Sequence, residues 1–427
     1  MEAVKEKAQL QKYSAYRNSG VEWLGEIPEH WEIKRLGSLL KPISEKNKPE
    51  LPLLSITREK GVIQRNIEDE DENHNYIPDD LSGYKVLRKG QFGMNKMKAW
   101  QGSYGISKFT GIVSPAYYVF DFYYEVDPDY FNTAIRSKKY ISFFGSASDG
   151  VRIGQWDLSK TRMKQIPFIL PPKQEQTAIA TFLDEKCGKI DTTIVQKEKL
   201  IELLKERKQI IIQNAVTKGL DHQVKMKDSG VEWIGEIPEH WEVKKLKFSA
   251  TLRSEKTISR NSSLPYLGLE NIESWTGNLV ETDSETEGQA NRFYSGDVLF
   301  GKLRPYLAKV YLSEKDGICS GEILAFKANE EVLNSFLHKT LLSYRFIDLV
   351  DSSTYGAKMP RANPTYIQLQ NIPIPGLDEQ KEIVKYIDVQ IEKSDKAIKY
   401  QQQQIEKLKE YKSSLIDAAV TGKIKVS

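Results

Sequence analysis

The sequence has only two cysteines and no long apolar runs. Cys187 and Cys319 lie far apart in the 427-residue chain, which argues against a disulfide framework or a zinc finger and favours a reducing cytoplasm. No run approaches the ~20 apolar residues of a membrane span, and the N-terminus carries no apolar secretory signal. The five histidines show no metal-ligand spacing. We therefore expect a cytoplasmic protein with no metal site and no membrane contact.

Motifs for catalysis are also scarce. No phosphate-binding loop of the G-x-x-x-x-G-K-[ST] type is present, which excludes a translocating ATPase motor. Asn363–Tyr366 (NPTY) resembles the signature of adenine methyltransferases, but Thr365 replaces its second proline and no glycine-rich cofactor loop precedes it. Glu32–Lys34 and Glu242–Lys244 fit the E-x-K of metal-dependent nucleases without a well-spaced further acid. We therefore predict no catalytic residues.

The chain is instead a tandem repeat. The segment NSGVEWLGEIPEHWEIKRL at Asn18 recurs as DSGVEWIGEIPEHWEVKKL at Asp228, identical at fifteen of nineteen positions. GIVSPAYYVF from Gly111 aligns with GICSGEILAF from Gly317, and both copies close on AVT. Identity is high at the ends of each copy and low in the middle. We interpret the similar ends as two copies of the same functional segment. The divergent middles would then have the same function on different targets. Neutral sequence drift of a duplicated scaffold is the alternative.

The end of each copy is predicted to be a helix of ~40 residues, about 60 Å long. The first covers about Gln174–Val216, and apolar residues recur in it at steps of three and four. Asp378 is a candidate N-cap of the second helix, and Gly219 and Gly422 are candidate stops. Gly188 could break the first helix. The predicted seam consists of Ile190, Ile194, Ile201, Leu204 and Ile211 in the first helix and Ile391, Ile398, Ile405, Leu408 and Leu415 in the second.

Polar residues interrupt both apolar seams, for example Lys197 and Lys208 in the first. Neither helix is therefore expected to be stable alone, and we expect the two helices to pack against each other. If the middles sit at opposite ends, this coiled coil is antiparallel and the copies are related by a pseudo-twofold axis. The middles read as mixed α/β domains, because runs such as AYYVFDFYY and EILAFKA favour short strands. The fold class is α+β. We expect an N-terminal arm (1–17), mixed domains at 18–165 and 221–371, and helical regions at 166–220 and 372–427.

The local distribution of charge is the sequence feature that most clearly indicates a function. Residues 83–120 hold six lysines and arginines and no acid, with aromatics between them, and basic positions recur in the second copy. Basic side chains neutralise phosphates, and Arg, Asn or Gln can read base edges; a solvated loop is the alternative for any single lysine. The predicted DNA-binding residues are Lys96, Lys98, Trp100, Tyr104, Lys108 and Arg152 in the first copy and Asn271, Lys302, Arg304, Tyr306, Tyr355, Lys358 and Arg361 in the second.

The repeated opening segment carries two tryptophans in each copy, Trp23 and Trp31 in the first and Trp233 and Trp241 in the second. Tryptophan buries a large area and leaves one N–H to satisfy. We predict that these residues form an interaction surface, either with a partner subunit or with the chain's own helices.

Together, the repeated SGVEW-GEIPEHWE segments, the diverged middles, the long helices and the AVT ends resemble the specificity (S) subunit of type I restriction-modification enzymes. The resemblance covers essentially the whole chain. It implies two target-recognition domains that read a bipartite double-stranded DNA target, joined by two helices in an antiparallel coiled coil. It also implies no catalysis and no cofactor in this subunit. Two methyltransferase (M) subunits would use S-adenosylmethionine, and restriction (R) subunits would use ATP and Mg²⁺.

The sequence departs from the family at one point, because AVTKGL in the first copy replaces the usual AVTGKI, which the second copy keeps. Two other functions stay open. A stand-alone methyltransferase or nuclease would need an active site of its own, and a coiled-coil scaffold would have no role on DNA.

Overall fold

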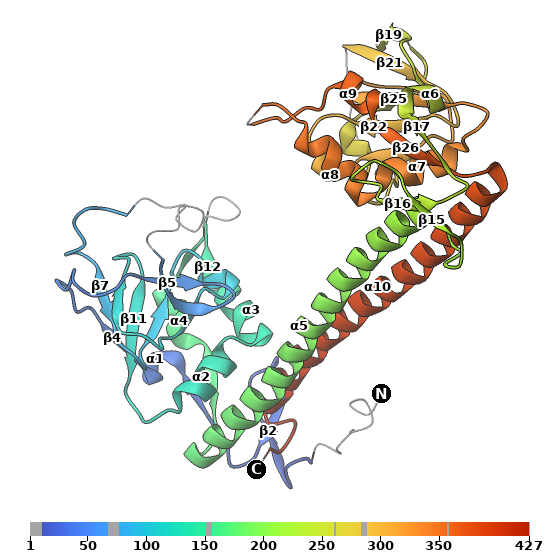
Figure 1. The fold of residues 1–427 in the computed structure, drawn as a ribbon. Coiled ribbons are helices and arrows are strands. Elements are labelled where there is room, and N and C mark those ends of the chain that lie inside the picture. Colours follow the sequence, from blue (N-terminus) through green and yellow to red (C-terminus); the bar gives the residue numbers. More distant parts are fainter. Residues whose placement is uncertain are drawn as a thin grey trace. The chain divides into compact units, whose positions relative to one another are not determined.

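The computed structural model describes residues 11–66, 77–150, 156–259, 262–282, 288–356 and 358–426. The chain divides into two compact units, each of which is described by itself below (Figure 1). Unit 1 contains Met1–Gln196 together with Gln403–Ser427, and unit 2 contains Lys197–Gln402. Each unit therefore combines one mixed α/β domain with parts of two long helices.

The mixed domain of unit 1 is built from short elements. Its strands are β1 (Tyr16–Asn18), β2 (Glu26–Pro28), β3 (Glu32–Arg35), β4 (Leu40–Ile43), β5 (Leu54–Thr57), β6 (Gly61–Gln64), β7 (Lys85–Leu87), β8 (Phe92–Met94), β9 (Tyr104–Ile106), β10 (Gly111–Val113), β11 (Tyr118–Phe122), β12 (Ser148–Asp149), β13 (Asp157–Leu158) and β14 (Pro167–Leu170). Its short helices are α1 (Leu36–Leu39), η1 (Ala99–Gln101), α2 (Pro128–Ile135), α3 (Lys138–Ser146) and α4 (Lys160–Gln165).

The mixed domain of unit 2 has a matching series of elements. Its strands are β15 (Met226–Asp228), β16 (Glu236–Pro238), β17 (Glu242–Lys245), β18 (Ala250–Leu252), β19 (Lys256–Ile258), β20 (Tyr266–Leu267), β21 (Gln289–Phe293), β22 (Val298–Gly301), β23 (Val310–Leu312), β24 (Gly317–Ser320), β25 (Ile323–Ala328) and β26 (Asn371–Ile374). Its short helices are α6 (Leu246–Ser249), η3 (Leu269–Asn271), η4 (Pro305–Leu307), α7 (Asn334–Leu342), α8 (Tyr344–Ser352) and α9 (Pro364–Leu369).

The duplicated sequence folds into a duplicated sheet. The four-stranded sheet of unit 1 has the order β4-β11-β8-β9, and that of unit 2 has the order β18-β25-β22-β23. All neighbours in both sheets are antiparallel. The strands expected in AYYVFDFYY and EILAFKA are confirmed, since they form β11 and β25. The predicted α+β class, with mixed domains and two long helices, is therefore confirmed.

Two glycines retained in both copies have a steric explanation. Gly111 in β10 lies so close to the Pro52 carbonyl oxygen that a Cβ there would overlap it. Gly317 in β24 is equivalent, because an added Cβ would lie 3.0 Å from the carbonyl oxygen of Pro265. In each case the next residue, Ile112 or Ile318, donates a backbone hydrogen bond to that same carbonyl, at 2.9 and 3.0 Å. Close backbone approach of this kind selects glycine.

The two long helices are α5 (Lys173–Lys218) and α10 (Leu377–Val420). Both stops are confirmed: Gly219 and Gly422 each have φ of 72°, the left-handed conformation that commonly follows the last helical turn. The expected N-cap is wrong, because α10 begins one residue before Asp378. That carboxylate instead lies in the first turn and forms an ion pair with Lys381 at 2.8 Å.

The helices are antiparallel within unit 2. Lys197 donates to Gln401 at 2.9 Å, and Lys208 forms an ion pair with Asp395 at 2.5 Å. The residue numbers rise along α5 while their partners' numbers fall along α10, as an antiparallel pair requires. The two lysines that interrupt the apolar seam are therefore each provided with a polar partner on the other helix. In unit 1 the corresponding contact joins Asp191 to Lys412 at 2.6 Å.

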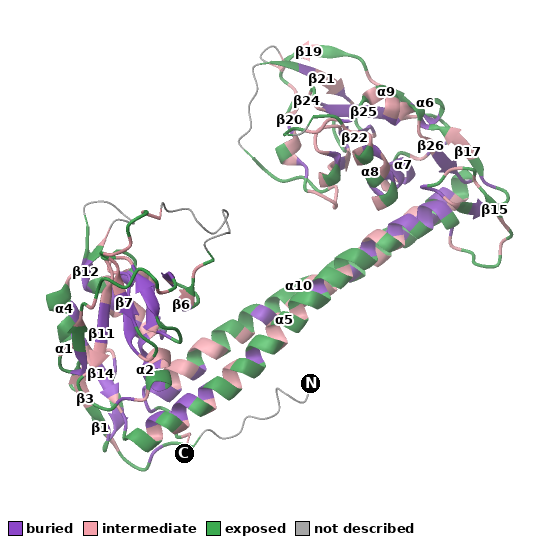
Figure 2. Ribbon diagram, turned by 60° about the vertical axis from the view of Figure 1, so that its left-hand side comes forward, coloured by how far each residue is buried: buried purple, intermediate pink, exposed green. Residues whose placement is uncertain are grey.

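The predicted seam follows the less exposed face of both helices (Figure 2). Helix α5 runs through Gly188 without a break. Near its end the seam shifts by one residue, because Ile212 is 1% exposed while Ile211 is only half-buried. An α-helix drifts relative to a strict heptad, and Ile212 belongs to the core of the second domain. The buried seam residues are Ile190, Ile201, Ile405 and Leu415, and the half-buried ones are Ile194, Leu204, Ile391, Ile398 and Leu408.

No helix in the described part of the chain is both long enough and apolar enough to cross a membrane.

Candidate nucleic-acid interface

The repeated segment of unit 1 joins the start of α5 to the end of α10. The buried indole of Trp31 donates from Nε1 to Glu175 Oε2 at 3.0 Å. Tyr13 and His30 bind the same carboxylate at 2.9 and 2.6 Å. Trp31 also packs on Gly422, where an added Cβ would lie 3.0 Å from its ring. Burial opposes ionisation of Glu175, but these hydrogen bonds outweigh it and hold the pKa of Glu175 below its usual value.

Unit 2 repeats this arrangement with the helices exchanged. Trp241 donates from Nε1 to Glu379, in the first turn of α10, at 2.9 Å. His240 binds the same carboxylate at 3.0 Å, and Trp241 packs on Gly219 at the end of α5. We call each set a helix clamp: Trp31, Glu175 and Gly422 in unit 1, and Trp241, Glu379 and Gly219 in unit 2. The opening segment is present twice because each clamp joins one helix start to one helix end.

The first tryptophan of each segment has a different role. Trp23 packs on Phe143 of α3, with ring centroids 4.0 Å apart. Trp233 donates to the carbonyl of Asn371 at 3.1 Å and packs edge-on against Phe346 of α8. Both tryptophans thus pack into their own mixed domain, and it is the second tryptophan of each segment that contacts a long helix.

In unit 1 the predicted basic residues follow strand β8. Lys96 forms an ion pair with Asp157 at 2.8 Å, and its carbonyl accepts a hydrogen bond from the backbone N–H of Leu158 at 3.0 Å. Lys98 is exposed. We call residues 95–102 and 156–160 the loop pair of unit 1. Its hydrogen bonds hold two segments about sixty residues apart in the sequence side by side.

Two indoles pack within this loop pair. Trp100 and Trp156 have ring centroids 5.1 Å apart, and both are half-buried. The Nε1 of Trp100 is buried without a hydrogen-bond partner among the described residues. A buried indole N–H without an acceptor is unfavourable in a finished core, so this position is one where a ligand could supply the missing acceptor.

Lysine side chains make the electrostatic field around the loop pair of unit 1 positive. Burial lowers the pKa of Lys85, and the neighbouring charges of Lys46, Lys160 and Lys96 lower it further. The hydrogen bond to Asp157 raises the pKa of Lys96 despite partial burial. Clustered cations of this kind attract a polyanion and lose their mutual repulsion when it binds.

Two predicted residues of the first copy, Tyr104 and Lys108, lie elsewhere. The prediction for Tyr104 is wrong, because its side chain is 0% exposed and packs against Phe92 and Phe144 in the core. Burial raises the pKa of this phenol well above its usual value. Lys108 is exposed in the connection between β9 and β10. Arg152 lies outside the described residues.

In unit 2 the equivalent loop follows strand β22 and is held in the same way. The backbone N–H of Ala362 donates to the carbonyl of Lys302 at 2.9 Å, and that of Arg304 donates to the carbonyl of Pro360 at 2.8 Å. We call the described residues 302–308, 355–356 and 358–362 the loop pair of unit 2. The bond between Ala362 and Lys302 corresponds to the one between Leu158 and Lys96 in unit 1.

The backbone of this loop pair is strained. In the described part of the chain, four residues other than glycine have positive φ, and three of them are Trp275, Arg304 and Ala308, at 65°, 49° and 46°. The backbone N–H of Trp275 donates to the carbonyl of Ala308 at 3.2 Å, so the three are close together. Left-handed conformations are unfavourable for such side chains and tend to cluster at functional sites.

The loop pair of unit 2 brings together most of the predicted residues of the second copy. Tyr306 and Tyr355 are 46% and 63% exposed, and Lys358 is also exposed. Arg361 donates from Nε to both carboxylate oxygens of Glu322 at 3.1 and 3.2 Å. Exposed aromatic and basic side chains thus share one surface, as phosphate binding and base stacking require.

Asn271 is engaged within its own loop. Its side-chain oxygen accepts from the backbone N–H of Gly268 at 2.8 Å, and its Nδ2 donates to Thr282 at 2.6 Å. The side chain therefore closes the turn after β20.

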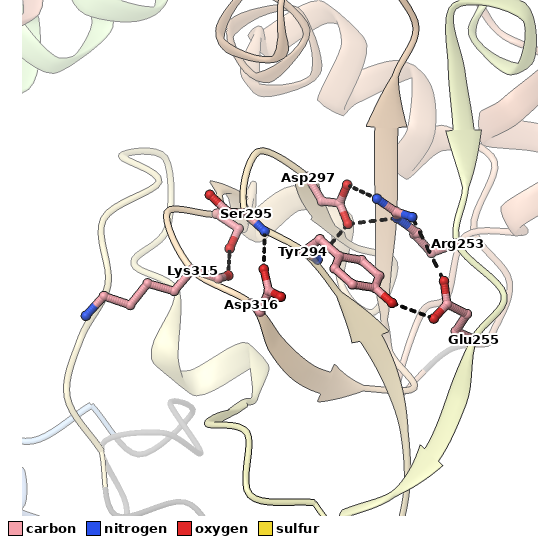
Figure 3. A network of polar contacts seen from close by, with 8 residues as sticks. Arg253, Glu255, Tyr294, Ser295, Asp297, Lys315 and Asp316 are labelled. Carbon is pink, nitrogen blue, oxygen red and sulfur yellow. Dashed lines mark hydrogen bonds and ion pairs between the residues drawn. The ribbon is translucent and has the colours of Figure 1, made fainter.

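A second arginine–carboxylate pair in unit 2 has a structural role (Figure 3). Arg253 binds Asp297 through both Nε and Nη2, at 2.9 and 3.0 Å. Its Nη1 lies 3.9 Å from Glu255, which accepts a hydrogen bond of 2.8 Å from the Tyr294 hydroxyl. Asp297 also accepts from the backbone N–H of Tyr294 at 2.8 Å and so closes the turn before β22.

The catalytic motifs weighed in the sequence have structural explanations. Asn363 is the N-cap of α9, where its side-chain oxygen accepts from the N–H of Thr365 at 2.8 Å. Lys34 pairs with Glu32 in β3 at 3.2 Å, and Lys244 pairs with Glu242 in β17 at 2.9 Å. Within the described residues, no group of three or more His, Cys, Asp or Glu side chains could hold a metal ion.

Sequence reasoning missed Trp156 and the two carboxylates, Asp157 and Glu322. Asp157 is the single acid beside a basic stretch, and that isolation could have marked it as the partner of a lysine. Glu322 lies 39 residues before Arg361, and no periodicity links the two.

Comparisons with known proteins agree with this architecture. The family described as "Type I restriction modification DNA specificity domain" matches residues 28–203 and 238–408. The specificity subunit of the type I restriction enzyme EcoDI from Escherichia coli is 24% identical over 391 residues, which cover 85% of this chain and 82% of that protein. The MjaVIII specificity subunit from Methanocaldococcus jannaschii is 25% identical, with 94% of both chains covered.

Two solved structures share the fold. The first is a chain from a structure that addresses complex assembly and conformational transition of the type I R-M system. It has a TM-score of 0.65 at 16% sequence identity, and the match covers 92% of this chain and 98% of that chain. The HsdS subunit from Thermoanaerobacter tengcongensis has a TM-score of 0.55 at 15% identity, covering 93% and 98%. The relatives are named specificity subunits, in agreement with the expected non-catalytic role. Because the family match includes both copies of the repeat, the chain belongs to the type I restriction-modification DNA specificity family.

Proposed function

We propose that each mixed domain is a target-recognition domain that reads one half of a bipartite, asymmetric DNA target. One observation carries this proposal: the loop pair recurs in both units on the same backbone hydrogen bond but with different side chains. The bond joins Leu158 to Lys96 in unit 1 and Ala362 to Lys302 in unit 2. A common frame with divergent side chains fits two readers of different sequences.

The side chains of the loop pairs suit double-stranded DNA. Lysines such as Lys98 and Lys358 are exposed and can neutralise phosphates. Arginine can read a base edge in the major groove, and exposed tyrosines such as Tyr306 and Tyr355 can contact bases or sugars. Phosphate contacts would position each domain, and base contacts would specify the half-site.

We further propose that the chain is the scaffold for its partner subunits in the cytoplasm. The two helix clamps give both ends of the helix pair the same construction, which suits the binding of two identical methyltransferase subunits. Restriction subunits would join through them. S-adenosylmethionine, ATP and Mg²⁺ would act in those partners, and this chain would hold none of them. The length of the helix pair would set the gap between the half-sites.

The test uses the full chain in complex with its methyltransferase subunits and S-adenosylmethionine. Sequencing of modified DNA should show methylated adenines on opposite strands, in two different half-sites separated by a fixed gap. One continuous palindromic site would contradict the proposal. The isolated chain should methylate and cut nothing, and robust methyl transfer or cleavage by it would support a stand-alone enzyme instead.

A second arm separates DNA reading from a purely structural scaffold. The combined substitution of Lys96, Lys98, Lys302 and Arg304 by alanine should weaken DNA binding by the complex and reduce its salt dependence. A scaffold without a role on DNA predicts that the complex with this variant binds DNA as the wild type does.

A further inference from the structure

The two arginine–carboxylate pairs of unit 2 use their guanidinium groups differently. Arg253 donates hydrogen bonds from both Nε and Nη2 to Asp297, and its Nη1 faces Glu255. Its plane also lies over the Tyr294 ring, at 4.4 Å from the centroid. Every nitrogen of Arg253 is therefore directed into its own domain (Figure 3).

Arg361 gives only its Nε to Glu322. Among the described residues, its Nη1 and Nη2 make no hydrogen bond, and its side chain is 37% exposed. The inner edge of the guanidinium is thus fixed by a carboxylate, while the outer edge, with four N–H donors, is available. A guanidinium held in this way loses little rotational freedom when a ligand binds.

The backbone around Arg361 is also fixed. Arg361 exchanges two backbone hydrogen bonds with Tyr355, at 3.1 and 3.2 Å, and it forms a bridge with Leu303. It therefore lies in the centre of the loop pair, between the strained loop that contains Arg304 and the exposed Tyr355. Both the position and the orientation of the side chain are set before any ligand arrives.

On this basis we propose that Arg361 reads a guanine in the half-site of the second domain and that Glu322 is its positioning residue. This inference rests on the proposed function. The outer edge of the guanidinium presents two parallel donors, which match O6 and N7 of guanine. Adenine offers an acceptor and a donor at the same positions, and thymine offers one acceptor beside a methyl group, so neither can accept both bonds.

The experiment measures methylation of DNA libraries in which each base pair of both half-sites is randomised. It uses the complex of the full chain with its methyltransferase subunits. Arg361→Ala should reduce discrimination at one G·C pair by roughly 5- to 150-fold, the range for one bidentate base contact. Arg361→Lys should also lower this discrimination, because lysine keeps the charge but has no planar fork to hold both acceptors. Glu322→Gln should keep guanine as the preferred base and lower the preference several-fold.

Two controls accompany these variants. The half-site of the first domain serves as an internal control, since its preferences should not change. Lys315→Ala removes an exposed cation of the same unit and should leave discrimination unchanged. Thermal unfolding of each variant shows whether it is folded, and the lysine variant keeps the assay informative if the alanine variant does not fold.

The outcomes separate this inference from the proposed function. A wild-type complex without any bipartite preference would refute the proposed function itself. A bipartite preference that Arg361→Lys leaves intact would overturn the inference alone. Uniform weakening on all sequences in Arg361→Ala would make Arg361 a phosphate contact, and it would also overturn the inference.

Discussion

Trp241 donates its indole N–H to Glu379 at 2.9 Å, and this bond, with that of His240 to the same carboxylate at 3.0 Å, links the opening segment of the second domain to the first turn of α10. The equivalent bond in unit 1 joins Trp31 to Glu175 at 3.0 Å. In both cases a buried donor relies on one carboxylate that lies far away in the sequence. Each clamp therefore attaches its domain to the helix pair, alongside contacts such as that of Leu333 with Gln380 at 2.8 Å.

Glu379→Ala should destabilise unit 2, because it leaves the buried Nε1 of Trp241 without an acceptor. The expected cost is about 1–3 kcal/mol in the free energy of unfolding, the range for an unsatisfied buried donor. Asp378→Ala is the matched control, since this neighbouring carboxylate is exposed and, among the described residues, forms its ion pair with Lys381. Denaturant unfolding measures both variants. Equal losses would show that the carboxylate acts through helix charge alone.

His338 should make unit 2 sensitive to acid. Burial, assisted by the charge of Lys339, lowers the pKa of His338 from 6.5 to about 4. Below pH 6.5 the unfolded chain takes up a proton that the folded chain refuses until about pH 4, so stability falls as the pH drops through this window. The full loss is about 3 kcal/mol at pH 4.

His338→Gln provides the comparison for this pH dependence. The amide can still donate to the carbonyl of Val310, which His338 contacts at 3.2 Å, but it does not titrate. The unfolding free energy of the variant should therefore depend less on pH between 4 and 6.5 than that of the wild type. Parallel curves for the two proteins would rule out His338 as the source.

Lys208 and Asp395 should determine the register of the helix pair in unit 2. Lys208 is 8% exposed, and its ammonium lies 2.5 Å from Asp395. Asp395→Ala leaves this cation unpaired, at a cost of about 1 kcal/mol after allowance for the exposure of the carboxylate. Lys205→Ala, which removes an exposed lysine one turn away, should change stability little. Replacement of Lys208 by methionine should be neutral or stabilising, whereas a large loss would contradict this account.

Lys98 should contact a phosphate more directly than Lys96. Lys98 is exposed, whereas Lys96 must first leave its ion pair with Asp157. Lys98→Ala should weaken binding of the complex to all DNA sequences and reduce the slope of log K against log salt by about one. Lys96→Ala should have the smaller effect. The measurement is a salt titration of DNA binding, and a change confined to one base position would instead identify a base contact.

The sequence predicted elements with local signals and failed where contacts are long-range. The two long helices, their glycine stops and most seam residues follow from periodicity and local chemistry, so α5 and α10 could be predicted. The start of α10 and the shift from Ile211 to Ile212 could not. Tyr104 could not, because an aromatic side chain in a short strand can face either the core or the solvent. Glu322 could not be predicted either, since Arg361 lies 39 residues away and no periodicity links the two. Asp157 lies 61 residues from Lys96, and only its isolation beside a basic stretch could have marked it. The near-identity of the two opening segments predicted that they have the same function. Only the structure shows that each segment forms a helix clamp.

The helix pair should act as a ruler for the gap between the half-sites. The boundary between the two units crosses α5 after Gln196 and α10 after Gln402. Four residues inserted in both helices, after Glu198 and after Gln402, would leave both clamps and both domains intact. Each helix would lengthen by ~6 Å and turn by about 40° beyond a full turn. DNA advances 3.4 Å per base pair, so the gap should grow by roughly one or two base pairs.

The two half-site sequences should stay unchanged in this doubly extended variant, because no side chain of either loop pair is altered. Insertion in α5 alone is the control. It would put the Lys208–Asp395 contact out of register with the Asp191–Lys412 contact, both of which the double insertion keeps, and should lower activity without producing a new gap. The measurement is a map of methylated sites for each variant in complex with its methyltransferase subunits. An active, doubly extended variant that keeps the original gap would show that the helices do not set the spacing, and the distance between the half-sites would then have to be fixed by the partner subunits.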